Sequence, residues 1–583
     1  MEKMSFLERK LEKAFEKYIY ISQIGLSPKE FAKKVSEIVL ADIVAAAVFI
    51  FLLVALRLKI ISVPAPPELV FSVITYAAFI IALVSVLTIM DPVLKTYEHL
   101  SMCKEELPYV SALLTVYAAA GVPPHKALER IGEKKELFPG FSRLVRRIKK
   151  IKKLYILDDL EAIESEARII PSLEVSDILF SAAGAERGGG DIYAVFRDKM
   201  KSAFSFLRES YKALADKMKF VADLILTLYG VLPLTLYIML AMFARGDVVA
   251  QANMYTYVVN PLIFIAMVLI VDGMYPKSPD KYTKYYKYYA KFFLPLAIGL
   301  FVVLYMFFGV IAERYLYWIK TSMTMYQIPI CLGIAVAASF IPVAVKFTLE
   351  YRRLSAIDFA LPSFCRDLTE EIKKGYTPSQ SIETLAKERS YNKHFDKILT
   401  DISRGLKGGL TFREALERVF SKVSWRTRLV FDLIIEADEL GSRPEIFEEI
   451  TNVTREIMDS IKVARESTRS LKFFGLITAG LIVAVICILV LQVLIPIAKT
   501  SSMITFESSG FYSFNVGVRF ITEKELPGLV STLLTGTIIN ALTLGLLTGK
   551  MSEGTLASGF RYSIITLVIS VIAILYLLGG IKI

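Results

Sequence analysis

The chain has 583 residues, of which 54% are hydrophobic, and its formal net charge is +12. Its mean hydropathy is +0.51, which is well above what soluble domains show. Apolar runs of about 18 residues or more recur along the chain, and each is long enough to cross ~30 Å of hydrocarbon as a helix. Composition therefore excludes a soluble globular protein and predicts an integral membrane protein.

The apolar runs predict nine transmembrane helices. They lie at about residues 39–58, 68–90, 220–243, 256–274, 292–312, 327–347, 472–498, 527–548 and 561–580. Their central parts hold almost no ionisable side chains, whereas ion-coupled transporters usually carry such groups inside the membrane. Small residues in the last spans, Gly536, Gly545 and Gly579, are expected to let helices approach closely. Pro233 and Pro496 are expected to kink the third and seventh spans.

The distribution of charge predicts the topology. Lys and Arg are abundant in the N-terminal segment and in two long segments between spans, and positive residues favour the cytoplasmic side. We therefore expect a cytoplasmic N-terminus without a cleaved signal peptide. The predicted organisation is an amphipathic cytoplasmic helix (1–35), transmembrane helices 1–2 (36–90), a first cytoplasmic bundle (91–219), transmembrane helices 3–6 (220–348), a second cytoplasmic bundle (349–471) and transmembrane helices 7–9 (472–583).

The two long segments share a pattern of turn and helix residues, which recurs roughly 250 residues further along the chain, as internal repeats do. The matched residues are Leu107-Pro108 with Leu361-Pro362, Gly121 with Gly375, Pro124 with Pro378, and Gly188 with Gly441. This pattern predicts one helical unit that occurs twice.

In the second copy the residues predict a helical hairpin. Gly375 is suited to end a helix because glycine adopts the left-handed conformation without a Cβ penalty. Thr377, Pro378 and Gln380 then form the sequence of a capping box with proline in the first turn. In the first copy Pro123 replaces the capping threonine. With the amphipathic segments that follow, we predict an all-α bundle of about six helices.

This combination of motifs resembles the type II secretion system F domain family, the polytopic platform proteins of type II secretion, type IV pili and the archaellum. The final turn, GKMSEGTLASGFRYS, contains Gly549, Lys550, Glu553 and Gly554 and resembles the archaeal branch, which includes the platform protein of the archaellum. The sequence does not choose between an archaellum and an adhesive or secretion pilus. The resemblance implies an all-α polytopic membrane protein with two cytoplasmic bundles. It also implies a hexameric secretion or archaellum ATPase and pilin- or archaellin-like subunits as partners.

The strongest charge cluster is the stretch RLVRRIKKIKK. Its basic residues are Arg143, Arg146, Arg147, Lys149, Lys150, Lys152 and Lys153. Three interpretations stay open: a solvated cytoplasmic face, an ATPase docking face, and contact with anionic lipid. By resemblance, Lys373 and Lys374 are further ATPase contacts, although cations at a helix C-terminus also complement the helix dipole.

No pattern of catalytic, metal-binding or cofactor-binding residues is visible. The sequence has no phosphate-binding loop, nucleophile elbow or zinc motif. Its four cysteines and three histidines share no ligand spacing. The acidic stretch 436–450 indicates a helix end and a helix start more than a cation site. We therefore expect no enzymatic activity, no cofactor, no metal and no nucleic-acid partner.

The sequence thus predicts a structural platform in the plasma membrane that couples a cytoplasmic ATPase to filament assembly or rotation. Lipid contact and a homodimer are expected, since symmetric dimers are the commonest oligomers. The alternative is a secondary transporter, but the repeats of such proteins lie in the spans.

Overall fold

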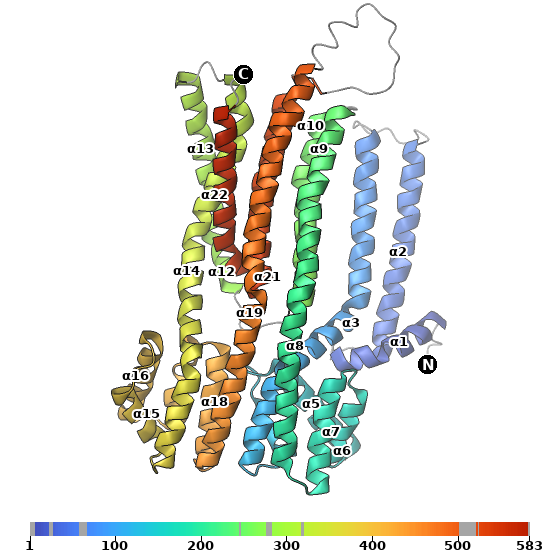
Figure 1. The fold of residues 1–583 in the computed structure, drawn as a ribbon. Coiled ribbons are helices and arrows are strands. Elements are labelled where there is room, and N and C mark those ends of the chain that lie inside the picture. Colours follow the sequence, from blue (N-terminus) through green and yellow to red (C-terminus); the bar gives the residue numbers. More distant parts are fainter. Residues whose placement is uncertain are drawn as a thin grey trace, which may run out of the picture. The chain divides into compact units, whose positions relative to one another are not determined.

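The computed structural model describes residues 6–22, 27–57, 67–243, 247–275, 283–315, 320–500, 521–522 and 524–580 (Figure 1). Over these residues the regular structure is helical, without strands. The chain divides into two compact units, Met1–Met200 and Lys201–Ile583.

Unit 1 contains an N-terminal set of long helices and a bundle. Its elements are α1 (Phe6–Ser22), α2 (Pro28–Arg57), α3 (Pro67–Ala119), α4 (Pro124–Glu133), α5 (Pro139–Tyr155), α6 (Asp159–Ile169), α7 (Leu173–Gly188) and the start of α8 (Ile192–Leu226). The amphipathic helix α1 packs on α2 and α3, where Phe15 meets Phe31 at a ring-centroid distance of 5.5 Å.

Unit 2 begins within α8 and holds a second bundle together with the later membrane helices. Its elements continue with η1 (Thr227–Val231), α9 (Leu232–Met242), α10 (Val248–Met254), η2 (Tyr255–Val259), α11 (Asn260–Met274), α12 (Thr283–Tyr288), η3 (Tyr289–Phe293), α13 (Leu294–Tyr315), α14 (Lys320–Lys373), α15 (Pro378–Glu388), α16 (Lys393–Lys407), α17 (Phe412–Glu417), η5 (Phe420–Lys422), α18 (Trp425–Glu439), α19 (Pro444–Ile488), η6 (Leu489–Leu494), α21 (Leu526–Glu553) and α22 (Leu556–Gly580). The second bundle consists of the end of α14, then α15 to α18, and the start of α19.

The bundle of unit 2 forms as its sequence predicts. Leu361, Phe364, Leu368 and Ile372 on α14 are all buried. Gly375 ends α14 with φ +97°. The Thr377 hydroxyl accepts from the Gln380 N–H at 3.3 Å, and the Gln380 side chain accepts from the Thr377 N–H at 3.1 Å, so the predicted capping box is present.

Unit 1 turns at the equivalent place without a side-chain cap, as Pro123 predicts. Gly121 has φ +78°, the conformation expected of it. At the later turn, however, the left-handed glycine is Gly189, with φ +64°, whereas Gly188 is the last residue of α7. The match of Gly188 with Gly441, which has φ +99°, is therefore displaced by one residue.

Three helices are longer than the sequence predicts, because bundle and membrane segments join without a break. Helix α3 has 53 residues, α14 has 54 and α19 has 45. Pro108 and Pro362 lie inside α3 and α14 and do not begin a helix. In unit 2, α14 and α19 each run as one helix from the bundle into the membrane-spanning set (Figure 1).

Seven helical segments among the residues searched are long and apolar enough to span a membrane: Ile192–Met242, Val248–Met274, Lys284–Gly309, Tyr326–Lys373, Pro444–Thr500, Leu526–Glu553 and Leu556–Leu577. They match the predicted spans three to nine. The first two predicted spans fall on α2 and α3, but the side chains of residues 49–84 lie outside the described residues. The chain is thus a multi-pass membrane protein.

Four π-helical turns share one cause. Each of η1, η2, η3 and η6 ends two residues before a proline, namely Pro233, Pro261, Pro295 and Pro496. Proline lacks the N–H that an α-helix needs, and its ring collides with the carbonyl one turn earlier. Widening that turn relieves the collision. The two predicted sites of distortion, at Pro233 and Pro496, are therefore helix widenings.

Candidate partner-binding face and ion-pair cluster

Helix α5, which carries the basic stretch, begins at a buried carboxylate. The Glu106 side chain of α3 accepts the backbone N–H groups of Gly140 and Phe141 at 2.7 and 2.8 Å. A carboxylate there satisfies two free donors of the first helical turn. Burial raises the pKa of Glu106 to about 7, against these hydrogen bonds, which lower it.

Arg147 cannot contact a partner. Its side chain is buried and forms an ion pair with the fully buried Glu166 of α6. It also donates to the carbonyl of Ile21 at 3.1 Å and lies over the ring of Tyr20. The prediction that Arg147 belongs to a docking face is therefore wrong; this residue fastens α1 and α6 to α5.

Two further basic side chains of α5 are engaged within unit 1. Lys149 pairs with Glu129 of α4 at 2.5 Å, and Lys152 pairs with Asp159 of α6 at 2.6 Å. Both lysines remain partly accessible, since each side chain is more than 40% exposed. They stabilise the bundle weakly, as surface pairs do.

The remaining four basic residues form a single stripe. Arg143, Arg146, Lys150 and Lys153 are all exposed, and their spacing of three and four residues places them along one side of α5. No acidic side chain of the described residues pairs with them. We call these four residues the α5 basic face.

An apolar tip adjoins the α5 basic face. Leu154, Tyr155 and Ile156 are 66%, 72% and 92% exposed. Ile156 is also left-handed, with φ +53°, which is an outlier conformation for a β-branched residue. Strain and exposed apolar surface at one position suggest a functional role. We call these three residues the α5 tip.

A groove lies beside the tip, between α4, α5 and α6. Its volume is about 700 Å³. Leu128, Val145 and Ile148 contribute apolar surface, while Lys126 and Lys153 contribute positive charge. This surface is suited to an apolar segment that carries negative charge.

Lys373 and Lys374, the other predicted contacts, are half exposed but paired inside the second bundle. Lys373 pairs with Glu448, and Lys374 pairs with Glu371 at 2.6 Å. Both lie at the C-terminus of α14, where cations complement the helix dipole. Their surroundings favour this structural role.

Two histidines have partners that the sequence analysis did not identify. His125 lies 2.5 Å from a Glu186 carboxylate oxygen. His99 lies one helical turn before Cys103, and the two contact at 3.9 Å. Burial, with a smaller effect of Arg147, lowers the pKa of His99 to about 4. The four-residue spacing of His99 and Cys103 was the available signal.

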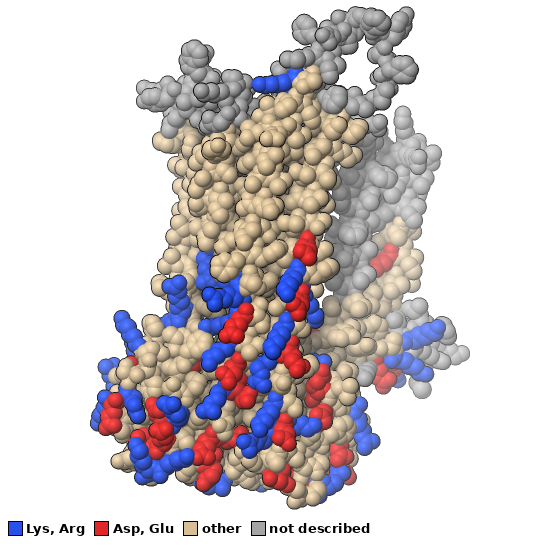
Figure 2. All heavy atoms as spheres, viewed as in Figure 1, with Lys and Arg blue, Asp and Glu red and all other residues tan. Residues whose placement is uncertain are grey.

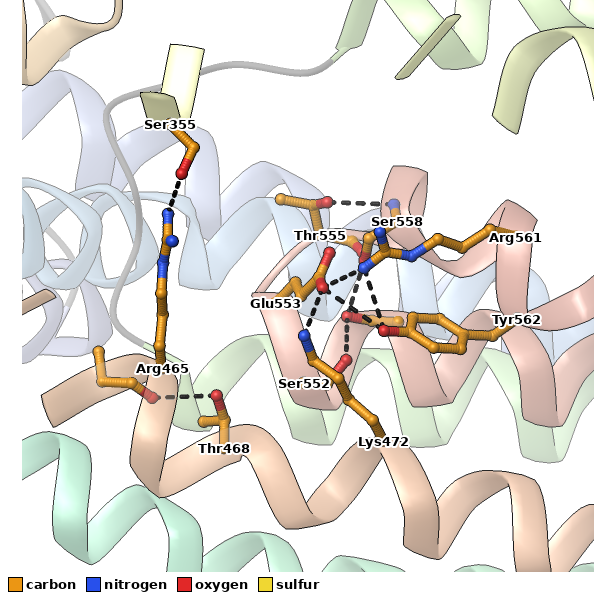
Figure 3. Close-up of polar contacts among 12 residues, drawn as sticks. Ser355, Arg465, Thr468, Lys472, Ser552, Glu553, Thr555, Ser558, Arg561 and Tyr562 are labelled. Carbon is orange, nitrogen blue, oxygen red and sulfur yellow. Dashed lines mark hydrogen bonds and ion pairs between the residues drawn. The ribbon is translucent and has the colours of Figure 1, made fainter. Parts of the chain in front are cut away.

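The C-terminal loop motif takes part in an ion-pair cluster at the bundle-side end of the membrane helices (Figure 3). The Glu553 carboxylate is almost fully buried and contacts Lys472 of α19 at 2.8 Å and Arg561 of α22. Arg561 also donates to the Tyr562 hydroxyl at 3.0 Å. Nearby in the sequence, Lys550 pairs with Asp272 of α11. These contacts join α11, α19, α21 and α22.

Glycines allow α21 and α22 to pack closely. A Cβ atom added to Gly549 would lie 2.2 Å from the backbone nitrogen of Gly559. One added to Gly545 would lie 2.3 Å from the Cα of Ser563. Gly554 caps α21 with φ +74°, and a Cβ atom added there would collide with the ring of Tyr275. The predicted close approach is confirmed at Gly545, and at Gly536 an added Cβ would lie 3.3 Å from the Thr256 hydroxyl of η2. The surroundings of Gly579 lie outside the described residues.

Neutral polar contacts also connect the membrane helices. Asn260 donates to Asn540 at 2.5 Å, and the hydroxyls of Tyr237 and Thr256 lie 2.9 Å apart. Within the part of the chain searched, no group of three or more His, Cys, Asp or Glu side chains is placed to hold a metal ion. In the acidic stretch, Glu439 pairs with Arg413 at 2.6 Å.

Comparison with known proteins gives one match. Residues 364–491 match the family described as "Type II secretion system (T2SS), protein F". The match covers the end of α14, all of α15 to α18, and α19 as far as η6. No curated protein and no solved structure matched the chain.

Proposed function

We propose that this chain is the membrane platform of a type IV pilus-like machine, an archaellum, an archaeal pilus or a type II secretion system. The observation that carries the proposal is the protein F match, which falls on a helical bundle continuous with membrane helices. Proteins of this family work with secretion ATPases and pilin-like subunits. The final turn of the chain supports the archaeal branch, in which archaellins take the place of pilins.

The continuity of α14 and α19 supports a mechanical role. A helix displaced at its bundle end moves at its membrane end too, because its backbone hydrogen bonds are internal. Lys472 on α19 then links this motion to α21 and α22 through Glu553. We infer that a cytoplasmic ATPase moves the bundle and that the spans transmit this motion to the filament base. On this proposal the chain itself is not an enzyme.

The α5 basic face, the α5 tip and the adjoining groove are our proposed docking surface for that ATPase. The charges of the face are not neutralised by described side chains, and the tip offers apolar surface that water solvates poorly. Rim charges accelerate association, and apolar anchors supply affinity.

Duplication of the bundle is supported by the order of elements. In each unit, a long helix ends at a left-handed glycine, a helix beginning with proline follows, and a later turn again uses a left-handed glycine. We propose that residues 91–219 and 349–471 are copies of one unit and that both face the cytoplasm. With both copies in the cytoplasm, the N-terminus is cytoplasmic as well. A plasma-membrane location and a homodimer belong to the same proposal.

The transporter alternative has no supporting observation. A flux assay in proteoliposomes separates the two: we expect no uptake of ions or small solutes above that of empty vesicles. Deletion of the gene should abolish surface filaments or secretion while leaving solute uptake unchanged. Solute uptake by the purified chain would contradict the platform function.

Docking is tested separately by co-purification of the cognate secretion ATPase with the full chain. Reversing Arg146, Lys150 and Lys153 to Glu should abolish capture. The matched control reverses Lys393, Lys397 and Lys407, which are exposed on α16 of the other bundle. Unchanged capture by the first variant would exclude the α5 basic face.

A further inference from the structure

Exposed lysines gather where two neighbouring membrane helices of unit 2 leave their apolar stretches. Lys284 and Lys287 lie on α12 and Lys291 on η3, at the start of the segment Lys284–Gly309. Lys346 lies on α14, directly after an apolar run. On the face that Figure 2 shows, blue side chains likewise gather at the lower edge of the uncharged band.

Aromatic rings hold two of these lysines, Lys291 and Lys346, on one surface. The Lys346 Nζ lies 4.3 Å from the ring centroid of Tyr288, and the Lys291 Nζ lies 5.4 Å from that of Phe292. The rings of Tyr288 and Phe292 are themselves 5.2 Å apart. Cation–π contacts of this kind orient an ammonium group and keep its charge. The ammonium groups of Lys346 on α14 and Lys291 on η3 therefore lie against two neighbouring aromatic rings.

Among the described residues, no carboxylate neutralises the charge of Lys287, Lys291 and Lys346. Glu350, one helical turn after Lys346, is already bonded to Lys284 at 2.5 Å and to the Tyr285 hydroxyl. Lys287, Lys291 and Lys346 are exposed, and no acidic side chain in the described ranges pairs with them. Three ammonium groups are thus available to an anion.

The surface next to these lysines is apolar and exposed. On α14 it includes Ile341 and Val345, which are 49% and 51% exposed, and on η3 and α13 it includes Phe292 and Leu296. Water would solvate such a surface poorly, whereas lipid acyl chains match it. Lysine stems that lie along apolar surface with the ammonium at the interface have the usual arrangement of membrane-anchoring residues.

We propose that Lys287, Lys291 and Lys346, framed by Tyr288 and Phe292, bind the phosphate headgroup of an anionic phospholipid. The acyl chains of this lipid lie against Ile341, Val345 and Leu296. The lipid thereby connects α12, η3 and α14 at the membrane interface. Because α14 continues into the bundle, this site anchors the helix at the level where it enters the membrane. The proposal rests on the lysine and aromatic geometry alone and does not depend on the platform function.

The test uses the full-length protein in nanodiscs containing phosphatidylglycerol and phosphatidylcholine, released into detergent and analysed by native mass spectrometry. The wild type should retain phosphatidylglycerol in preference to phosphatidylcholine. Lys346→Gln should lower this retention about fivefold, as one basic residue near a charged surface does. The triple substitution of Lys287, Lys291 and Lys346 by Gln should abolish the preference. Replacing Lys393, Lys397 and Lys407 by Gln removes the same charge from α16 and should leave the preference unchanged.

Three results would overturn the proposal. The first is equal retention of both lipids by the wild type, which requires no variant and holds even if the triple variant fails to fold. The second is that the α16 control loses its preference for phosphatidylglycerol as fully as the triple variant does, which would show a response to net charge only. The third is displacement of the lipid by millimolar inorganic phosphate, which would show a site for free phosphate and not for a lipid headgroup.

Discussion

Lys472, on the helix that leaves the second bundle, lies 2.8 Å from Glu553, which ends the penultimate membrane helix. The contact joins two residues that are 81 positions apart in the sequence. Glu553 is almost fully buried, and Arg561 approaches it from α22. Three helices, α19, α21 and α22, thus meet at a single carboxylate (Figure 3).

The first prediction concerns this carboxylate. Glu553→Gln removes the negative charge that two cations share, and breaking a buried pair costs up to 3–5 kcal/mol. Since Lys472 is about one-third exposed, we expect a smaller loss of about 2 kcal/mol. The midpoint of thermal unfolding in detergent should fall accordingly.

Lys462→Met is the matched control for this prediction. Lys462 lies on the same helix and pairs with Asp459 at 3.5 Å, with both side chains more than half exposed. Its substitution should change the midpoint very little. A variant Glu553→Gln as stable as the control would show that the cluster does not hold the helices together.

The second prediction concerns two buried ionisable residues of α3, Glu106 and His99. The pKa of Glu106 is about 7 in the fold, above its ordinary value of 4.5, so its contribution to stability decreases as the pH rises from about 4.5 to about 7. The pKa of His99 is about 4, below its ordinary 6.5, so its contribution increases as the pH rises from about 4 to about 6.5. The two slopes oppose each other in the wild type.

Single substitutions should therefore expose slopes of opposite sign. Between pH 4.5 and 6.5, the thermal midpoint of Glu106→Gln should rise with pH relative to wild type, and that of His99→Gln should fall. Each substitution should change the free energy of unfolding, relative to wild type, by on the order of 2 kcal/mol across this pH range. Parallel profiles for all three proteins between pH 4 and 8 would contradict this account.

The sequence predicted local features better than long-range ones. Thr377 and Gln380 are three residues apart, and their capping box follows from the chemistry of one turn. Leu361, Phe364, Leu368 and Ile372 recur at three- and four-residue spacing, and helical periodicity alone places them on one face, which is buried. Span positions follow from hydropathy in the same way.

Features that depend on partners far along the chain could not be predicted. Arg147 follows Leu144 by three residues and precedes Ile151 by four, so helical spacing already places it on the apolar side of α5. Only the fold reveals its partners, Glu166 and the carbonyl of Ile21. Likewise, Leu-Pro pairs commonly precede a helix start, but Pro108 and Pro362 stand inside helices of more than 50 residues. A missing N–H is tolerated there because the rest of a long helix remains bonded.

The third prediction concerns the strained tip of α5. Ile156→Gly removes a left-handed β-branched residue, and this conformation costs roughly 1–2 kcal/mol in residues other than glycine. We expect the free energy of unfolding of unit 1 to rise by about 1 kcal/mol. Slower hydrogen exchange of the backbone amides of α5 would show this gain. The same variant should capture less of the secretion ATPase, because it loses an exposed apolar side chain.

Leu173→Ala is the control for the third prediction. Leu173 is 85% exposed at the start of α7 and is not left-handed. Its substitution should change neither exchange nor capture. If Ile156→Gly slowed exchange but left capture intact, the tip would be strained without taking part in docking.

The last prediction concerns the close contact of α21 and α22. In Gly549→Ala the new Cβ would lie 2.2 Å from a backbone nitrogen of the facing helix, where no side chain can move aside. The two helices must separate, and we expect a loss of about 3 kcal/mol, at the upper end for overpacking. Separation also displaces Glu553 from Lys472, so the double variant Gly549→Ala with Glu553→Gln should lose less stability than the sum of the two single effects.

Gly480→Ala is the control for this prediction, since a Cβ there meets nothing within 4 Å, and it should be neutral or slightly stabilising. Additive losses of stability in the double variant, measured by thermal unfolding, would show that the glycine contact and the ion-pair cluster are independent of each other.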